Sequence, residues 1–184
     1  MTSTAGRTSR PIPLLVTAAL LASIAGPARA SDPVKEAEDT VARFKKTDSS
    51  SSKFFEGAAG WAVFPTIGKG AIGIGGAHGT GVLFEGGKAI GKTKLTQVTI
   101  GLQLGGQSYS EIVFFEDAAS LNDFKKGDFA LAAQVSAVAA ASGAAANAKY
   151  ERGVAVFTMT KGGLMYEASV GGQKFSFEAY DKKK

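Results

Sequence analysis

Few residues in this sequence of 184 have the types and spacing that chemistry requires. Gly68-Lys-Gly70-Ala-Ile-Gly73 satisfies G-x-G-x-x-G, the loop with which dinucleotide-binding proteins hold a pyrophosphate. That loop must lead into a helix whose N-terminus faces the phosphates, whereas here the sequence continues IGIGGAHGTG. Because glycine at this density does not sustain a helix, we interpret the stretch as a bend in a β-hairpin. We therefore expect no nucleotide to bind.

Other candidate catalytic groups are isolated. His78 is the only histidine, and no cysteine accompanies it, so a metal site or a Ser/His/Asp triad has no paired ligand nearby in sequence. Gly106-Gln-Ser108-Tyr-Ser110 lacks the last glycine of a nucleophile elbow. Glu111 alternates with apolar residues, so we expect it to face inward against a lysine. These observations predict no enzyme, no metal site and no cofactor; a hydrolase built around His78 is an alternative that His78→Ala would test.

The N-terminus has the layout of a secretory signal peptide. Arg7 and Arg10 precede an apolar run over residues 14–25, and Ala28-Arg-Ala30 provides a cleavage site before Ser31. The run is shorter than the roughly 20 residues that a membrane-spanning helix needs. We expect an exported protein, located in the periplasm or secreted.

The net charge of the chain bears on whether its partner is a nucleic acid. The full sequence has 21 Lys and Arg against 16 Asp and Glu, and removal of residues 1–30 would take away Arg7, Arg10 and Arg29 and no acid. The remaining net charge is 18 minus 16, or +2. A nearly neutral chain is not expected to bind nucleic acid.

Apolar spacing predicts an α+β fold. Residues 33–46 have a helical period, with Asp32 and Pro33 as the start signals, and a serine-rich break follows over residues 47–52. After Gly60 the period is two, with glycine pairs between short apolar runs. A short internal helix is expected over residues 117–125, and residues 129–148 are ambiguous, with a strand favoured for the first half. The strands are expected at residues 61–65, 71–77, 81–84, 97–104, 108–115, 154–160, 164–170 and 174–179.

These elements define the predicted architecture. We expect a mainly antiparallel, strongly bent or barrel-like sheet, with an N-terminal helix and one short internal helix. Glycines inside strands permit the bends that such a sheet needs. The strand at residues 154–160 is apolar on both faces, so it should be covered on both sides.

The glycine string also belongs to a wider pattern. Ala59-Gly-Trp61-Ala-Val-Phe-Pro65, Lys69-Gly70 and Gly73-Ile-Gly-Gly-Ala-His-Gly79-Thr-Gly81-Val resemble the opening of the SYLF lipid-binding domain. Gln97 to Phe115, residues 124–129, residues 153–160 and Gly163-Leu-Met-Tyr-Glu167-Ala-Ser-Val-Gly171-Gly resemble its later segments in the same order. The chain is thus similar to exported bacterial members of this family, which is related to the yeast actin-patch SYLF proteins.

The resemblance implies a function in lipid binding without catalysis. Family members bind phosphoinositides or other anionic phospholipids, and some fungal relatives bind actin filaments. The implied division is a signal peptide over residues 1–30, an amphipathic helix and serine-rich break over residues 31–52, and a SYLF-like domain over residues 53–184. The expected partner is an anionic phospholipid membrane surface, to which the protein attaches peripherally. An envelope structural or protein-interaction module, with an envelope protein as its partner, is the alternative.

Lysines and neighbouring aromatic residues are the candidate lipid contacts. The set is Lys45, Lys46, Lys53, Phe54, Phe55, Lys69, Lys88, Lys92 and Lys94. Two alternatives stay open. In the first, Phe54 and Phe55 are core residues and the lysines form a solvated surface. In the second, the lysines meet anionic headgroups and the aromatic residues enter the membrane interface. Lys69 is expected either to pair with a carboxylate such as Glu111 or to contact a headgroup, with pairing favoured.

Overall fold

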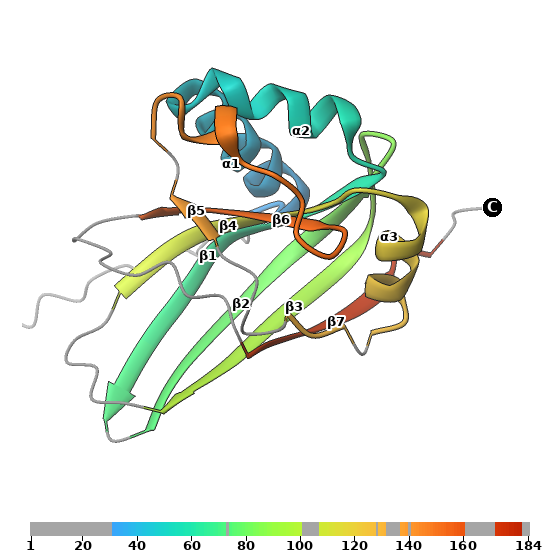
Figure 1. Ribbon diagram of the computed structural model, residues 1–184. Helices are drawn as coiled ribbons and strands as arrows, with labels where there is room; N and C mark the ends of the chain where they lie inside the picture. Colours follow the sequence, from blue (N-terminus) through green and yellow to red (C-terminus); the bar gives the residue numbers. More distant parts are fainter. Residues whose placement is uncertain are drawn as a thin grey trace, which may run out of the picture. The chain divides into compact units, whose positions relative to one another are not determined.

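The computed structural model describes residues 31–72, 74–100, 107–127, 129–131, 137–139, 141–160 and 172–181. Within these residues, helices lie against one face of a mainly antiparallel sheet, and one short helix lies against the other face (Figure 1). The predicted α+β class is confirmed.

The N-terminal helix α1, Pro33–Thr47, forms as the sequence predicts. The side chain of Asp32 accepts a hydrogen bond from the backbone N–H of Val34 at 2.9 Å, which caps the first turn. Ala37, Thr40 and Phe44 are its buried residues, and their spacing of three and four places them on one stripe facing the sheet.

A second helix follows where the sequence indicates only a polar break. Asp48 accepts hydrogen bonds from the backbone N–H groups of Ser50, Gly143 and Ala145, at 3.0, 3.1 and 2.7 Å. These bonds hold the 3₁₀ turn η1, Ser49–Ser51, against a second turn, η2, Ala144–Asn147. The helix α2, Ser52–Gly57, then begins directly.

The sheet has the strand order β5-β6-β4-β1-β2-β3-β7. All described pairs are antiparallel except β5 with β6. The strands are β1 Gly60–Ile72, β2 Ile74–Glu85, β3 Lys88–Ile100, β4 Gln107–Phe115, β5 Ala137–Ala139, β6 Val154–Thr160 and β7 Gln173–Ala179. The short helix α3, Ala118–Lys125, follows β4 and is capped by Asp117, as predicted for residues 117–125.

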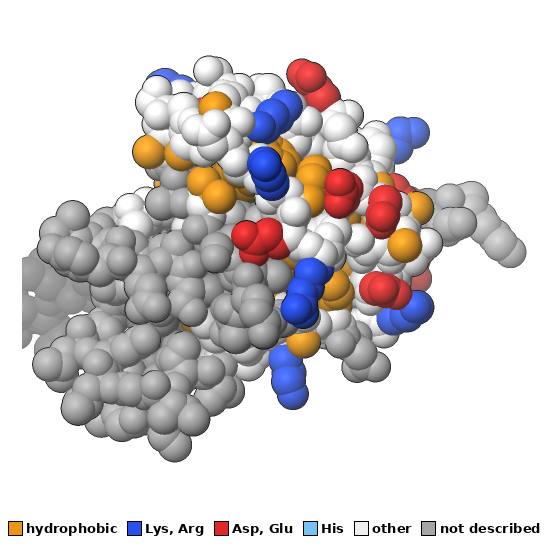
Figure 2. All heavy atoms as spheres, viewed as in Figure 1, with side chains coloured by type: hydrophobic (Ala, Val, Ile, Leu, Met, Phe, Trp, Pro, Cys, Tyr) orange, Lys and Arg blue, Asp and Glu red, His pale blue; other side chains and the backbone are white. Residues whose placement is uncertain are grey.

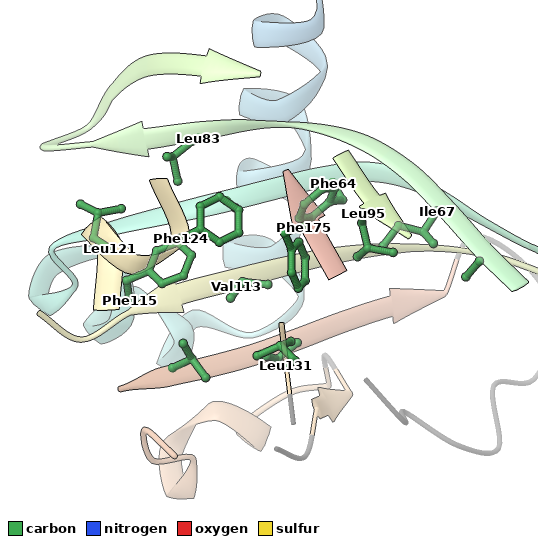
Figure 3. Packing of buried hydrophobic residues seen from close by; sticks show 14 of the residues in the cluster. Phe64, Ile67, Leu83, Leu95, Val113, Phe115, Leu121, Phe124, Leu131 and Phe175 are labelled. Carbon is green, nitrogen blue, oxygen red and sulfur yellow. The ribbon is translucent and has the colours of Figure 1, made fainter. Parts of the chain in front are cut away.

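Two hydrophobic clusters, one on each face, hold the sheet. The outer core lies beneath α1 and α2 and contains Phe44, Phe54, Phe55, Val63, Val82, Phe84, Ile112, Phe114, Ala155 and Phe157. The inner core lies beneath α3 and contains Ala62, Phe64, Ile67, Leu83, Leu95, Val113, Phe115, Leu121, Phe124, Leu131, Val154, Val156 and Phe175 (Figure 3). The side chains of β6 therefore enter both clusters, which confirms that this strand is covered on both sides.

The sheet is strongly bent toward the inner core. Three strands separate β4 from β7 in the sheet order, yet Gln173 of β7 donates a hydrogen bond to Glu111 of β4 at 3.0 Å. The rings of Phe64 on β1 and Phe175 on β7 also meet, with centroids 5.7 Å apart. Figure 3 shows side chains from these strands converging on the same space. Curvature thus brings opposite parts of the sheet together.

Residues 129–131 and residues 137–139 pair at opposite ends of the sheet without closing it. Phe129 and Leu131 exchange backbone hydrogen bonds with the outer edge of β7, and Ala137–Ala139 pairs with β6. Between them, residues 132–136 lie outside the described part. In that described part β5 and β7 form no pair with each other, so of the two predicted forms the structure shows the bent sheet and not a closed barrel.

The glycine-rich stretch differs in detail from its prediction. Gly68, Lys69 and Gly70 lie inside β1 and pair with β2, instead of forming a bend. The strand irregularity lies earlier, between Val63 and Thr66, where β1 contains a bulge. The expected strand at residues 164–170 and the end of the one at residues 97–104 lie outside the described residues.

Candidate functional site

The helix α1 crosses one face of the sheet, here called the outer face. Its first residues lie beside β3 and β7, since Pro33 and Glu36 line a cavity together with Lys92 and Phe177. Its last residue reaches β6, where the hydroxyl of Thr47 donates to the sulfur of Met159 at 3.7 Å. A helix of 15 residues is about 22 Å long, so the two ends mark two separate regions of the outer face.

Three predicted lysines gather at the C-terminal end of α1. Lys45 and Lys46 occupy its last turn, where their charges complement the helix dipole. The Nζ atom of Lys45 lies 4.5 Å from the centre of the Phe55 ring. Lys53 donates a hydrogen bond to the carbonyl of Ala146 at 2.8 Å. All three lysines are exposed, so their charges face solvent.

The predicted aromatic contacts lie inside the outer core. Phe54 is 3% exposed and Phe55 is 9% exposed. The ring of Phe54 packs edge-on against Phe157 at 4.9 Å between centroids, and that of Phe55 packs edge-on against Phe114 at 4.8 Å. In this arrangement neither ring is presented to a membrane. Their membrane-contact role remains a prediction, while their packing role is visible.

Two further predicted lysines lie at the other end of α1. Lys92 and Lys94 on β3 are exposed, and they alternate with buried Thr93 and Leu95. Because alternate residues of a strand point to opposite faces, both lysines point to the outer face. They line a cavity of about 530 Å³ between the start of α1 and strands β2, β3 and β7.

The last two predicted lysines are separate from these groups. Lys88 begins β3, opposite Glu85, and roughly 13 Å of extended strand separates it from Lys92. Lys69 lies in β1 opposite Ala77 and Gln107, and its side chain is outside the described part. The structure thus brings Lys45, Lys46 and Lys53 together, and Lys92 with Lys94, and leaves Lys88 apart.

Charges of both signs share the visible surface. Figure 2 shows Lys and Arg side chains interspersed with Asp and Glu side chains, in agreement with a chain close to neutrality. Within the described residues, ion pairs join Lys35 to Asp39 and Lys125 to Glu85, at 3.0 and 2.7 Å. Attraction to an anionic surface therefore depends on the local groups of lysines and not on net charge.

Glu111 is a buried acid whose pKa is strongly raised. It faces inward as predicted and is fully buried, and its partner among the described residues is the amide of Gln173. The expected pairing with a lysine such as Lys69 involves a side chain outside the described part. Burial raises the pKa of Glu111 from 4.5 to about 8, and the hydrogen bond from Gln173 only partly offsets this. Burial, with a smaller contribution from the charge of Glu111, raises the pKa of Tyr109 above its usual range.

The remaining chemical candidates are scattered. The strand β2 follows the GKGAIG stretch where a phosphate loop would require a helix. His78 is exposed on β2, and the hydroxyl of Ser110 is buried and donates to the carbonyl of Pro65 at 2.8 Å. Within the described residues no group of three or more His, Cys, Asp or Glu side chains is placed to hold a metal ion.

Several residues that line the cavity were not predicted from the sequence. Glu36 comes from the first turn of α1, and Ser176 and Glu178 come from β7. Alternation of Lys174, Ser176 and Glu178 with buried Gln173 and Phe175 indicates that β7 has one exposed face. The pairing of Lys92 with Glu178 across β3 and β7 joins residues too far apart in sequence to be predicted.

Among the helices that the structure describes, none has both the length and the apolar character that a membrane span requires.

Comparison with known proteins agrees with this fold and sequence pattern. Residues 96–184 match the family model Ysc84, described as "Las17-binding protein actin regulator". A curated relative, "Beta cell expansion factor A" of Aeromonas veronii, is 27% identical over 142 residues, which is 76% of this chain and 53% of the relative. The chain thus spans about half the length of that relative. The part of the chain from residue 96 to residue 184 therefore matches the SYLF (Ysc84) family.

Proposed function

We propose that this protein binds lipids peripherally at an anionic phospholipid surface of the bacterial envelope, as an exported and non-catalytic member of its family. The observation that carries the proposal is the placement of Lys45, Lys46, Lys53, Lys92 and Lys94 on the outer face, at the two ends of α1. Each lysine near an anionic membrane contributes about 1 kcal/mol. Five of them together give about 5 kcal/mol, enough for reversible attachment.

Electrostatics rather than insertion drives this attachment. Phe54 and Phe55 are held in the outer core by several ring contacts, so their exposure would cost packing energy. The lysines need no such rearrangement, because their side chains are already exposed. Binding should therefore weaken as salt is added.

Sedimentation with vesicles tests the proposal. Wild-type protein should sediment with phosphatidylglycerol vesicles and not with phosphatidylcholine vesicles. The loss of two attractions in the pair Lys92→Glu and Lys94→Glu alone predicts roughly thirtyfold weaker binding, and the two new negative charges weaken it further. Lys126→Glu is the matched control, since Lys126 is exposed beside α3, which packs on the opposite side of the sheet. Equal binding by the double variant and the control would exclude this surface.

A second candidate is a protein-interaction module. It is favoured by the description of the family model, which names a protein that family members bind. For an exported chain, the partner would be an envelope protein. Pull-down from envelope extracts by a protein that fails to bind any vesicle would support this candidate over the first.

A further inference from the structure

The cavity beside Lys92 contains charges of both signs. Lys92 and Lys94 come from β3, Glu178 comes from β7, and Glu36 comes from the first turn of α1. Its volume of about 530 Å³ lies within the range of small-molecule sites. The buried residues Pro65, Gly81 and Val82 also line it. The cavity therefore combines apolar surface with charged groups.

The strand register arranges these charges in pairs. Lys92 lies directly opposite Glu178, and Lys94 lies opposite Ser176, on strands about 4.8 Å apart. Lys92 and Lys94 share one face of β3 with a spacing of about 7 Å. Among the described residues, none of these four charged side chains takes part in an ion pair within 4.0 Å. The four charged side chains are therefore close enough to contact one small molecule, and they do not neutralise one another in ion pairs.

We propose that this cavity binds a zwitterionic phosphate ester, of which phosphoethanolamine is the simplest example. The phosphate lies against Lys92 and Lys94, and the primary ammonium lies against Glu36 and Glu178. As a lipid-headgroup site, the cavity rests on the proposed function. The lysines at the other end of α1 then attract the protein to the membrane, and the cavity distinguishes one headgroup from another.

A purely anionic ligand fits this cavity less well. The two lysines would attract it, but Glu36 and Glu178 would repel it at the same short range. A ligand with a primary ammonium converts that repulsion into attraction and donates hydrogen bonds to the carboxylates. The quaternary ammonium of phosphatidylcholine has no N–H group, so it cannot donate these bonds. Headgroup preference should therefore depend on the two glutamates.

The test compares vesicles and soluble compounds on the purified full chain. Phosphatidylcholine vesicles receive an equal fraction of phosphatidylethanolamine or of phosphatidylglycerol, and O-phosphoethanolamine, inorganic phosphate and ethanolamine are added separately as soluble probes. Wild-type protein should prefer phosphatidylethanolamine over phosphatidylcholine, and O-phosphoethanolamine should compete better than either fragment. Amide NMR shifts should localise the soluble ligand to Thr93 and Ser176.

Charge variants separate the inference from the proposed function. Glu36→Gln with Glu178→Gln should abolish the preference for phosphatidylethanolamine and strengthen binding to phosphatidylglycerol roughly thirtyfold. Lys92→Ala with Lys94→Ala should weaken both, while Lys126→Ala should change neither. Vesicle binding with a headgroup preference that the glutamate variant retains would overturn the inference and leave the proposed function standing. Binding of O-phosphoethanolamine without any vesicle binding would support the cavity's ligand chemistry and overturn the proposed function.

Discussion

Replacement of Glu111 by Gln should make the protein more stable at neutral pH. The wild-type carboxyl is fully buried, and no lysine or arginine is among its described partners. The Oε1 atoms of both Glu111 and Gln173 lack hydrogen-bond partners among the described residues. A protonated carboxyl, or an amide in its place, supplies a donor to such a cluster, whereas an ionised carboxylate adds an uncompensated charge.

The magnitude follows from the pKa of Glu111, which burial raises from 4.5 to about 8. A carboxyl whose pKa is higher in the folded chain holds its proton more tightly there. The contribution of Glu111 to stability is therefore fully present below pH 4.5 and is lost as the pH rises toward 8. The loss is about 1.4 kcal/mol for each pH unit, or roughly 3 kcal/mol by pH 7.

Denaturation by urea at a series of pH values measures this effect. The free energy of unfolding of Glu111→Gln minus that of wild type should rise by about 1.4 kcal/mol per pH unit between pH 5 and 7, because other titrating groups cancel in the difference. Tyr109, the titratable neighbour, stays neutral across this range, because the ordinary pKa of a tyrosine is about 10 and that of Tyr109 is raised further. A difference that falls with pH would refute the reasoning, since it would show that the carboxylate is ionised and paired with a cation such as Lys69.

Four further substitutions test the packing. Asp48→Ala should cost about 2 to 4 kcal/mol, because it leaves the buried backbone N–H of Ala145 and the part-buried N–H of Gly143 without their acceptor; urea denaturation measures the loss. Phe54→Ala should cost about 3 to 5 kcal/mol in the same assay, and a cost below 1 kcal/mol would contradict its place in the outer core. Gly81→Ala should lower the melting temperature because its Cβ would collide with the carbonyl of Val63, whereas Gly68→Ala meets open space and should leave it nearly unchanged. Equal melting temperatures for the two alanine variants would show that the collision is not present.

Local capping signals were sufficient to predict where the helices α1 and α3 begin. Asp32 with Pro33, and Asp117 before Ala118, mark N-termini that the structure reproduces. The polar break was only partly predicted, since Asp48 is stabilised by N–H groups from residues 143 and 145, far along the chain. Contacts of that kind leave no local pattern.

Glycine residues did not interrupt the strands where their low β-propensity predicts a bend. Gly68 and Gly70 lie within β1 because β2 pairs along this part of the strand, and β4 also pairs with it at Gly68. Likewise, Lys88 to Leu95 was not predicted as a strand, although β2 and β7 flank β3. Tertiary pairing outweighs weak β-propensity in both places.

Only some residues of the candidate site could be predicted from the sequence. Lys92 and Lys94 were predicted as lipid contacts because they form a cluster of lysines with Lys88, and the structure places both of them in one cavity. Glu36 and Glu178 could not be joined to them from sequence, because the path of α1 and the register of β7 are tertiary facts. Burial of Phe54 and Phe55 beside exposed lysines was equally undecided until the outer core was visible.

The salt dependence of vesicle binding tests the central claim most directly. Affinity of the full chain for phosphatidylglycerol vesicles should fall steeply as ionic strength rises from about 0.01 M to 0.15 M, where the screening length drops from about 30 to 8 Å. Lys92→Glu with Lys94→Glu should bind less tightly and depend less on salt. Affinity that is unchanged across this range, or no vesicle binding at the lowest salt, would contradict the account.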